Sequence, residues 1–247
     1  MKKITFILLF ITQIFWAQNG FETGNKLYEK EKYAEAVINY EAVLRSGNQS
    51  AELYFNLGNA YYKQNKVAPA IYNYEKALVL KPGDKEILGN LHFAQKMTID
   101  EIKEVPKVGF EKLLRDFTGA YHYDCWAWMA VSLSFAFLLF FVGYYFSQTT
   151  LLKRIFFIGM FVLVFAILLS ILSALFEKSH YENERPAIVF AEVAEVKSEP
   201  RSNASNAFVL HEGTKVMVLE KTAGWSKVEL LDDSTGWIEN NAIREVK

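Results

Sequence analysis

Catalytic and metal-binding signatures are absent from this sequence of 247 residues. Its single cysteine, Cys125, excludes an internal disulfide and a cysteine-rich metal site. The four histidines, at positions 92, 122, 180 and 211, do not have the spacing of metal ligands. There is also no G-x4-G-K-[ST] phosphate loop, no H-E-x-x-H motif and no G-x-S-x-G motif. We therefore expect a protein that is not an enzyme, with no catalytic residue, no metal site and no cofactor.

An excess of positive charge is absent as well. The chain has 27 Lys and Arg residues against 28 Asp and Glu residues, which gives a net charge of −1. Residues 18–124 are nearly balanced, and residues 177–247 contain more acids than bases. Neither segment offers the basic surface that binding to a phosphate backbone requires, so nucleic acid is not an expected partner.

Charged residues are missing from two long apolar stretches, which predict transmembrane helices at 125–146 and 155–176. Each stretch is long enough to cross ~30 Å of hydrocarbon, and the alternative is a pair of buried helices in a soluble protein. With no ionisable side chain inside either span, we expect membrane anchors rather than a transport path. Small residues recur every four positions at Ala166, Ser170 and Ala174. They favour close packing, either within this hairpin or against a helix of another membrane protein.

The first residues have the pattern of a secretory signal. Lys2 and Lys3 precede an apolar run at 4–16 that is too short to span a membrane. Ala17, followed by a glutamine, is a plausible cleavage point. We therefore predict a signal peptide at 1–17 and export of the residues that follow it.

The loop between the two predicted spans indicates the same orientation. Residues 147–154 form a short loop that contains Lys153 and Arg154 and no acid, and such loops stay in the cytoplasm. The predicted location is therefore the inner (cytoplasmic) membrane, with the segments before and after the hairpin in the periplasm. A juxtamembrane segment at 106–124 and a linker at 177–185 would flank the spans. The juxtamembrane segment contains an apolar stripe that is expected either at the membrane surface or packed under the preceding helices.

An internal repeat with a period of 34 residues occupies 18–84. Glycine, alanine, asparagine, tyrosine and leucine recur one period apart, as the pairs Gly24/Gly58, Ala36/Ala70, Asn39/Asn73, Tyr40/Tyr74 and Leu44/Leu78. This period, with helical apolar spacing, predicts an array of helix–turn–helix units. The copy at 51–84 resembles the tetratricopeptide repeat (TPR) through Tyr54, Leu57, Gly58, Tyr61, Ala70, Tyr74, Ala77 and Pro82, and the copy at 17–50 is more degenerate. Residues 85–105 are expected to form a capping helix with an apolar stripe that begins with Leu88, Leu91 and Ala94 and is interrupted by Gln95.

The resemblance to TPR arrays also implies a binding surface. First-helix residues outside the packing stripe line the concave face of such arrays, and here they are Asn25, Tyr28, Asn56, Asn59, Tyr62 and Asn90. Their amides can pair with the backbone of an extended peptide. The alternative is that they are ordinary solvated residues. Phe21 and Glu86 stand where the carboxylate-clamp subtype has lysine, so a C-terminal carboxylate is not the expected ligand.

Residues 186–247 predict a small all-β barrel of five short strands, the first at Ala187–Val196, with a polar loop at Ser202–Asn206. Three runs, at 213–219, 224–228 and 236–238, match the G-x-x-V-x-V-L, G-W-x-K-V and G-W-I pattern of bacterial SH3 (SH3b) domains. The resemblance implies ligand contacts at Trp225 and Trp237, because aromatic side chains supply large contact areas. Packing in the core or in turns is the alternative for both.

The predicted fold class is thus a multidomain membrane protein with an all-α TPR repeat, a two-helix transmembrane hairpin and an SH3-like barrel. This order resembles the BatE family of the Bacteroides aerotolerance operon. The resemblance implies von Willebrand A-domain membrane proteins and other Bat components as protein partners, with a functional link to a MoxR-type AAA+ ATPase. The expected function is a non-enzymatic membrane adaptor. The alternative is a cell-wall tether that binds peptidoglycan through the SH3b domain.

Overall fold

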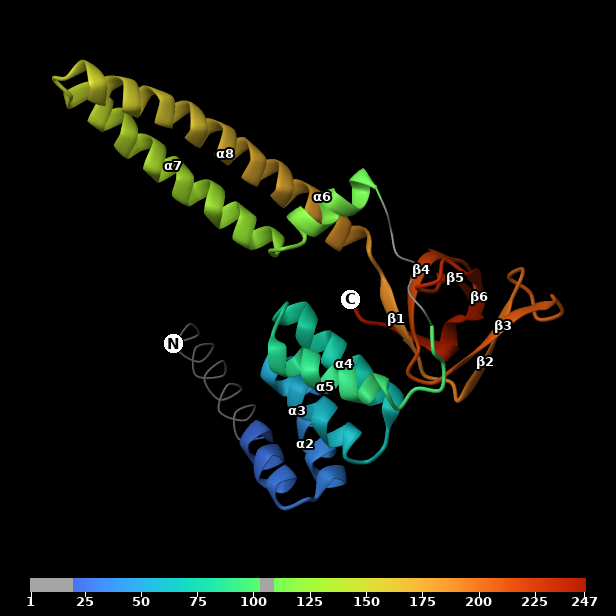
Figure 1. Cartoon of the computed structure of the whole chain (residues 1–247). Coiled ribbons are helices and arrows are strands. Elements are labelled where there is room, and N and C mark those ends of the chain that lie inside the picture. The colour runs from blue at the N-terminus through green and yellow to red at the C-terminus, as the bar shows by residue number, and fades with distance from the viewer. Residues whose placement is uncertain (1–19, 103–108) are drawn as a thin grey trace, which may run out of the picture. The chain divides into compact units, whose positions relative to one another are not determined.

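A computed structural model describes residues 20–102 and 109–247, without the side chains of residues 110 and 111. The predicted signal peptide and the last residues of the expected capping helix lie outside these ranges. The chain forms two compact units. One combines the residues before the hairpin with those from Arg185 onward, and the other runs from the juxtamembrane segment to Glu184 (Figure 1). We call the first unit the head and the second the hairpin unit.

The head begins with the predicted helical repeat. Its helices are residues 20–29, α2 (Tyr33–Arg45), α3 (Ala51–Tyr62), α4 (Val67–Leu80) and α5 (Lys85–Gln95). Two side chains one period apart cap the N-termini of α3 and α5. Ser50 accepts a hydrogen bond from the backbone of Leu53, and Asp84 accepts bonds from the backbone of Glu86 and Ile87. The repeat in sequence is therefore also a repeat in helix boundaries.

Close contacts between a glycine and a tyrosine fix the packing inside each repeat. A Cβ on Gly24 would lie 2.4 Å from the ring of Tyr40, and one on Gly58 would lie 2.8 Å from the ring of Tyr74. Both tyrosines are almost completely buried. The glycines are required because any side chain would push the two helices of the repeat apart.

The capping helix differs from the prediction in length and in phase. Helix α5 ends at Gln95 rather than at 105, and the Thr98 hydroxyl then donates to the Gln95 carbonyl in a turn. The buried stripe consists of Ile87, Leu91 and Ala94, whereas Leu88 is 45% exposed. The cap at Asp84 sets this phase, because it places α5 in the same register as α3 one period earlier. Leu88 lies one period after Tyr54, which packs against residues of α4. Residues 96–102 form no second helix that could cover Leu88 in the same way.

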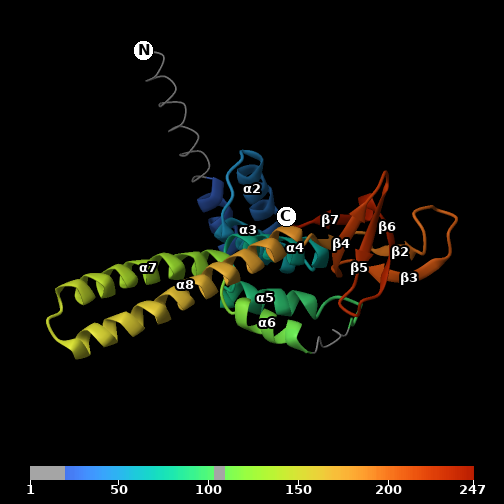
Figure 2. The same ribbon diagram turned by 90° about the horizontal axis from the view of Figure 1, so that it is seen from above.

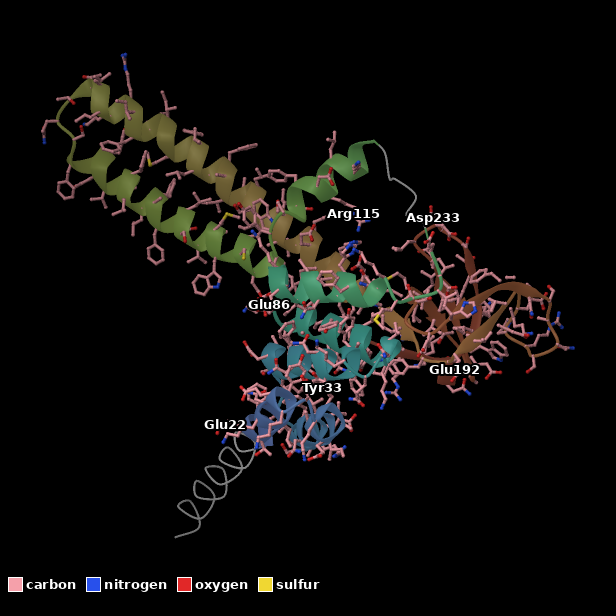
Figure 3. All side chains as sticks on the ribbon, turned by 60° about the horizontal axis from the view of Figure 1, so that its bottom comes forward. Glu22, Tyr33, Glu86, Arg115, Glu192 and Asp233 are labelled. Carbon is pink, nitrogen blue, oxygen red and sulfur yellow. The ribbon has the colours of Figure 1, made fainter. Side chains whose placement is uncertain are left out.

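The rest of the head is an antiparallel sheet that curls around one apolar core. Its order is β3-β2-β6-β5-β4-β1-β7. The strands are β1 (Pro186–Val189), β2 (Val193–Lys197), β3 (Asn206–His211), β4 (Lys215–Lys221), β5 (Trp225–Glu229), β6 (Thr235–Glu239) and β7 (Ile243–Glu245). The all-β part of the predicted fold class is confirmed. Figure 3 labels Glu192 and Asp233 in two of its turns, between β1 and β2 and between β5 and β6.

The expected number of five strands is wrong, since the sheet has seven. The stretch expected as one strand at Ala187–Val196 divides into β1 and β2, because the backbone amides of Phe190 and Ala191 both bond to the Ala242 carbonyl and bend the chain there. Strand β3 begins at the end of the expected polar loop. Most of its residues are exposed or only partly buried, so the sequence has no alternating apolar pattern that would predict this strand.

The helical repeat and the barrel share one apolar core. All four residues of β1 are buried. Ala187 and Val189 face the core of the barrel, while Ile188 joins Ile71 and Leu91 in the core of the helices. Val246, just after β7, joins the same helical cluster. The barrel thus covers the end of the helical array and supplies burial that two repeats alone lack.

Polar contacts surround this shared core. The Lys215 ammonium donates to both oxygens of the Glu75 carboxylate, at 2.8 and 2.9 Å, and Glu75 is buried. Asp100 accepts bonds from the Thr214 hydroxyl at 2.6 Å and from the His211 backbone amide at 2.7 Å. Burial opposes ionisation of Asp100, but the bonds from Thr214 and His211 outweigh it and hold the pKa of the carboxyl below its usual value.

Both chain connections to the hairpin unit are fastened to the barrel. On the first, Asp100 makes the bonds just described and Ile102 packs against the barrel core. On the second, Arg185 makes a bidentate ion pair with Glu245 of β7, with contacts of 2.8 to 3.1 Å. Its carbonyl also accepts a bond from the backbone of Val218.

The hairpin unit contains α6 (Phe110–Thr118), α7 (Tyr123–Phe146) and α8 (Thr150–Asn183). The last two run antiparallel side by side in both views (Figures 1 and 2), and both are long and apolar enough to cross a membrane. Their side chains are almost entirely carbon and project outward along most of their length (Figure 3). The expected spans 125–146 and 155–176 lie inside these helices, which are longer.

Small residues bring α7 and α8 together. A Cβ on Gly159 would lie 2.3 Å from the Phe140 ring, and one on Gly143 would lie 2.8 Å from the Phe156 ring. Ser170, one of the predicted small residues, is buried between the helices. These contacts match the alternative in which the small residues pack within the hairpin itself.

Helix α6 belongs to the hairpin unit and packs against α8. The Thr118 hydroxyl at its end donates to Glu177 of α8 at 2.5 Å, and the Thr118 carbonyl accepts a bond from the Trp126 indole at 2.7 Å. Leu113 and Phe117 remain exposed on its outer side. The two positions expected for this stripe, at the membrane surface and under the repeat, stay predictions.

Candidate binding sites

Asparagine side chains form two identical tiers on the helical repeat. In the first tier, the Asn25 carbonyl accepts bonds from the Tyr40 hydroxyl at 2.7 Å and from the Asn56 amide at 3.0 Å. In the second tier, one period later, Asn59 accepts from Tyr74 at 2.7 Å and from Asn90 at 2.8 Å. Four of the six predicted groove residues therefore belong to one repeated hydrogen-bond pattern.

The tiers divide the asparagines into two roles. Both bonds in each tier end on the carbonyl oxygen of Asn25 or Asn59, so that oxygen is saturated and the amide NH₂ group is turned away from the tyrosine. In Asn56 and Asn90 one amide hydrogen is used, which leaves the carbonyl oxygen and the second hydrogen. Each tier thus presents donors and an acceptor together, which is the pairing that the backbone of an extended peptide requires.

The tyrosines hold these amides in place. Burial, with smaller contributions from Tyr28 and Glu29, raises the pKa of Tyr40 to about 12. Burial likewise raises the pKa of Tyr74. Both hydroxyls therefore stay protonated and act as donors at any physiological pH. The amides are oriented before a ligand arrives, which lowers the entropy that binding must offset.

A hollow of about 210 Å³ opens over the first tier. Its walls are Asn25, Tyr28, Glu29, Tyr40, Asn56 and Asn59. Two predicted groove residues, Asn90 and Tyr62, do not line the hollow. Asn90, on α5, donates a hydrogen bond to Asn59, which does line it. Glu29 is a wall residue that the sequence reasoning missed, although it follows Tyr28 directly.

A second cavity, of about 600 Å³, lies in the barrel. One wall is Trp225 of β5, and the floor includes the buried side chains of Ala194 and Ile238. The lining also contains five polar residues: Glu195, Lys197, Ser202, Glu239 and Asn241. An aromatic wall, an apolar floor and a few polar groups are typical of a site for a small ligand or a short peptide.

The two predicted tryptophans have different neighbours. Both lie on the outer face of the sheet, because the residues that alternate with them on β5 and β6 are buried. Trp225 lines the cavity and pairs across the strands with Glu239. Trp237 does not line it, and its cross-strand partners are Lys227 on one side and Lys197 on the other.

Comparison with known protein families agrees with this architecture. Residues 24–65 match the TPR repeat, residues 51–84 match the tetratricopeptide repeat, and residues 192–244 match the bacterial SH3 domain. This chain contains TPR repeats and a bacterial SH3 domain. No curated protein matches it. The resemblances on which the fold class was predicted are confirmed, and the two apolar helices lie outside the matched regions.

The hollow over the asparagine tiers, which we call the TPR groove, and the cavity beside Trp225, which we call the SH3b cavity, both present hydrogen-bonding groups and aromatic surface. Within residues 20–102 and 109–247, the acids, histidines and cysteine form no group of three that would hold a metal ion. The SH3b lining residues Glu195, Lys197 and Glu239 were not predicted, because cross-strand neighbours follow from strand register, which the sequence does not state.

Proposed function

We propose that this protein is a non-enzymatic, membrane-anchored adaptor whose head binds peptide segments of partner proteins. The observation that carries the proposal is the pair of asparagine tiers, which are oriented by buried tyrosines and open onto a hollow. TPR repeats and SH3b domains are binding modules, and their combination in one compact head suits a scaffold. Two helices with outward-facing apolar side chains supply the anchor.

The chain connectivity supports one orientation for the whole head. Helices α7 and α8 are antiparallel, so a bilayer crossed by both would have their outer ends on the same side. The helical repeat precedes α7 and the barrel follows α8. Their shared core requires both to be on the same side of the bilayer. We assign that side to the periplasm of the inner membrane, because of the basic loop and the N-terminal signal pattern.

The order of modules further supports a place in a Bat-type envelope complex, by its resemblance to the BatE family. The partners would then be von Willebrand A-domain membrane proteins and other Bat components, with a functional link to a MoxR-type AAA+ ATPase. In this setting the TPR groove holds an extended segment of one partner.

Two substitutions test the groove without disturbing its framework. Asn56→Ala and Asn90→Ala remove the outer amide of each tier and leave the bonds from Tyr40 and Tyr74 intact. Each lost amide contact is worth about 1 kcal/mol, so the double variant, which loses two, should bind its partner roughly thirtyfold more weakly. The measurement is quantitative mass spectrometry of proteins cross-linked to the full chain in its native membranes.

Asn39→Ala is the matched control, since the Asn39 amide bonds to the Glu35 carbonyl in its own helix. Recovery of von Willebrand A-domain proteins with wild type and the control, but not with the double variant, supports both the groove and the Bat setting. Equal recovery of every partner by all three proteins contradicts the groove.

A second candidate function is a cell-wall tether, favoured by the Trp225-walled cavity in an SH3b domain. In this case the barrel would bind peptidoglycan. Co-sedimentation of the full chain, in detergent, with purified murein tests it. The full chain is needed because an isolated barrel would expose Ile188 and Val246, which are buried against the helices. Absence of co-sedimentation removes the tether.

A further inference from the structure

The SH3b cavity contains an unbalanced charge. Three ionisable residues line it: Glu195, Lys197 and Glu239. The Lys197 ammonium donates to Glu195 at 2.6 Å and to the Asn206 side chain at 2.6 Å, and its side chain is only 13% exposed. Glu195 and Lys197 therefore neutralise each other.

Glu239 is different. Its carboxylate has no ion pair or hydrogen bond with any other side chain in the part of the chain that the structure describes. Because it lines the cavity and is exposed, its charge is available to a ligand. The net negative charge of these three side chains favours a ligand with a positive group.

The aromatic wall adds to the same preference. Trp225 lies directly across from Glu239 on the neighbouring strand. The face of an indole ring attracts cations, and a carboxylate beside it strengthens that attraction. Trp237 is placed differently, because its cross-strand partners are Lys227 and Lys197 rather than an acid. The barrel has two outward tryptophans, but only one of them is built to receive a cation.

We propose that the SH3b cavity binds a basic segment of a partner protein, with a lysine-type ammonium between Trp225 and Glu239. The volume of about 600 Å³ accommodates the side chain together with adjoining backbone. This inference rests on the proposed adaptor function, because it assigns the barrel a peptide ligand of its own. A positively charged segment of a protein is favoured over murein because the same head already carries the proposed peptide groove.

The test uses the full chain in detergent micelles, titrated with two blocked tripeptides. One is Ac-Gly-Lys-Gly-NH₂, and the other replaces lysine with the uncharged norleucine. Binding is followed through the tryptophan indole signals in ¹H–¹⁵N NMR spectra. We expect the lysine peptide to shift the Trp225 signal and to bind about fivefold or more tightly than the norleucine peptide.

Matched variants locate the site. Glu239→Gln should abolish the preference for lysine, whereas Glu229→Gln, on the same outer face but outside the cavity, should keep it. Trp225→Leu should remove binding, and Trp237→Leu should not. Equal binding of the two peptides, or an unchanged preference in Glu239→Gln, overturns the proposal.

Two further arms separate this proposal from its alternatives. If amine-bearing murein fragments bind and the lysine peptide does not, the cavity serves a wall ligand and the proposal fails. The Asn56→Ala, Asn90→Ala double variant should bind the lysine peptide as wild type does. Failure of the groove proposal can therefore be distinguished from failure of the cavity proposal.

Discussion

The head and the hairpin unit contain similar apolar residues, but these are buried in the head and largely exposed in the hairpin unit. In the head, Ile71 and Ile188 are completely buried. In the hairpin unit, Phe161, Phe165 and many residues like them are exposed along α8. Apolar burial explains the stability of the head in water, whereas the exposed apolar side chains of the hairpin are suited to a lipid solvent. Stability in the two units therefore has different sources, and single substitutions should separate them.

The largest expected effect comes from Ile188→Ala at the shared core. Ile188 is 0% exposed between the barrel and the helices. Loss of its side chain should cost about 2–5 kcal/mol. Hydrogen exchange measured by mass spectrometry on the full chain in detergent should reveal reduced protection of β1 and α4 together, with α7 and α8 unchanged.

Val209→Ala is a suitable control for this experiment, because Val209 lies on β3 and is exposed. Its effect should be within about 0.5 kcal/mol. Loss of protection in β1 with α4 unaffected would contradict a common core.

Gly58→Ala should have the next largest effect. The added Cβ would meet the Tyr74 ring at 2.8 Å, which predicts a loss of about 1–3 kcal/mol from the helical repeat. Gly89→Ala is the matched control, since a Cβ there meets nothing within 4 Å. It should be neutral or stabilising by up to about 1 kcal/mol. Urea unfolding of both variants measures the difference, and equal effects would refute the tight glycine–tyrosine packing.

Gly159→Ala addresses the other side of the comparison. Its Cβ would lie 2.3 Å from the Phe140 ring, so α7 and α8 should separate slightly at a cost of about 1 kcal/mol. Exchange should increase in α7 and α8 and stay the same in the head. Leu168→Ala, at an outward-facing position, should change neither unit. An effect of Gly159→Ala on the head would mean that the two units are not independently stabilised.

Acid should destabilise the head in a way that depends on Asp100. Because the pKa of its carboxyl is lower in the folded state than its ordinary value of 3.8, ionised Asp100 stabilises the fold above that value. The contribution is lost as the pH falls through the folded-state pKa. Asp100→Asn should therefore be less stable near neutral pH and lose less stability than wild type between about pH 5 and about pH 3.

Urea unfolding across that range measures the two slopes. Glu245, whose pKa is also lowered through Lys221 and Arg185 against the effect of burial, should retain its own acid dependence in both proteins. Parallel slopes for wild type and Asp100→Asn would show that Asp100 plays no part.

Much of the fold followed from local patterns in the sequence. The 34-residue period identified the repeat because Gly58 and Tyr74 must meet at fixed spacing, and the second copy keeps both residues in place. The barrel was recognisable from Gly224–Trp225 and Gly236–Trp237, which occupy turn and strand positions. The seven strands were harder to predict, because the exposed residues of β3 have no alternating pattern.

The binding sites were only partly predictable. The concave position of Asn25, Asn56, Asn59 and Asn90 follows from the repeat, but their bonding to tyrosines of the second helix does not. The common core was missed for another reason. Glu75 and Lys215 are separated by 140 residues, and no local spacing predicts that they pair.

The anchoring of both chain connections on the barrel has a mechanical consequence. In the proposed membrane-anchored form, tension along either connection would be applied first at Asp100 and Ile102 or at Arg185, and all three contact the barrel. Such tension would therefore reach the barrel before it reaches the helical repeat. A partner in the proposed TPR groove would then contact a surface that the tension reaches only through the barrel.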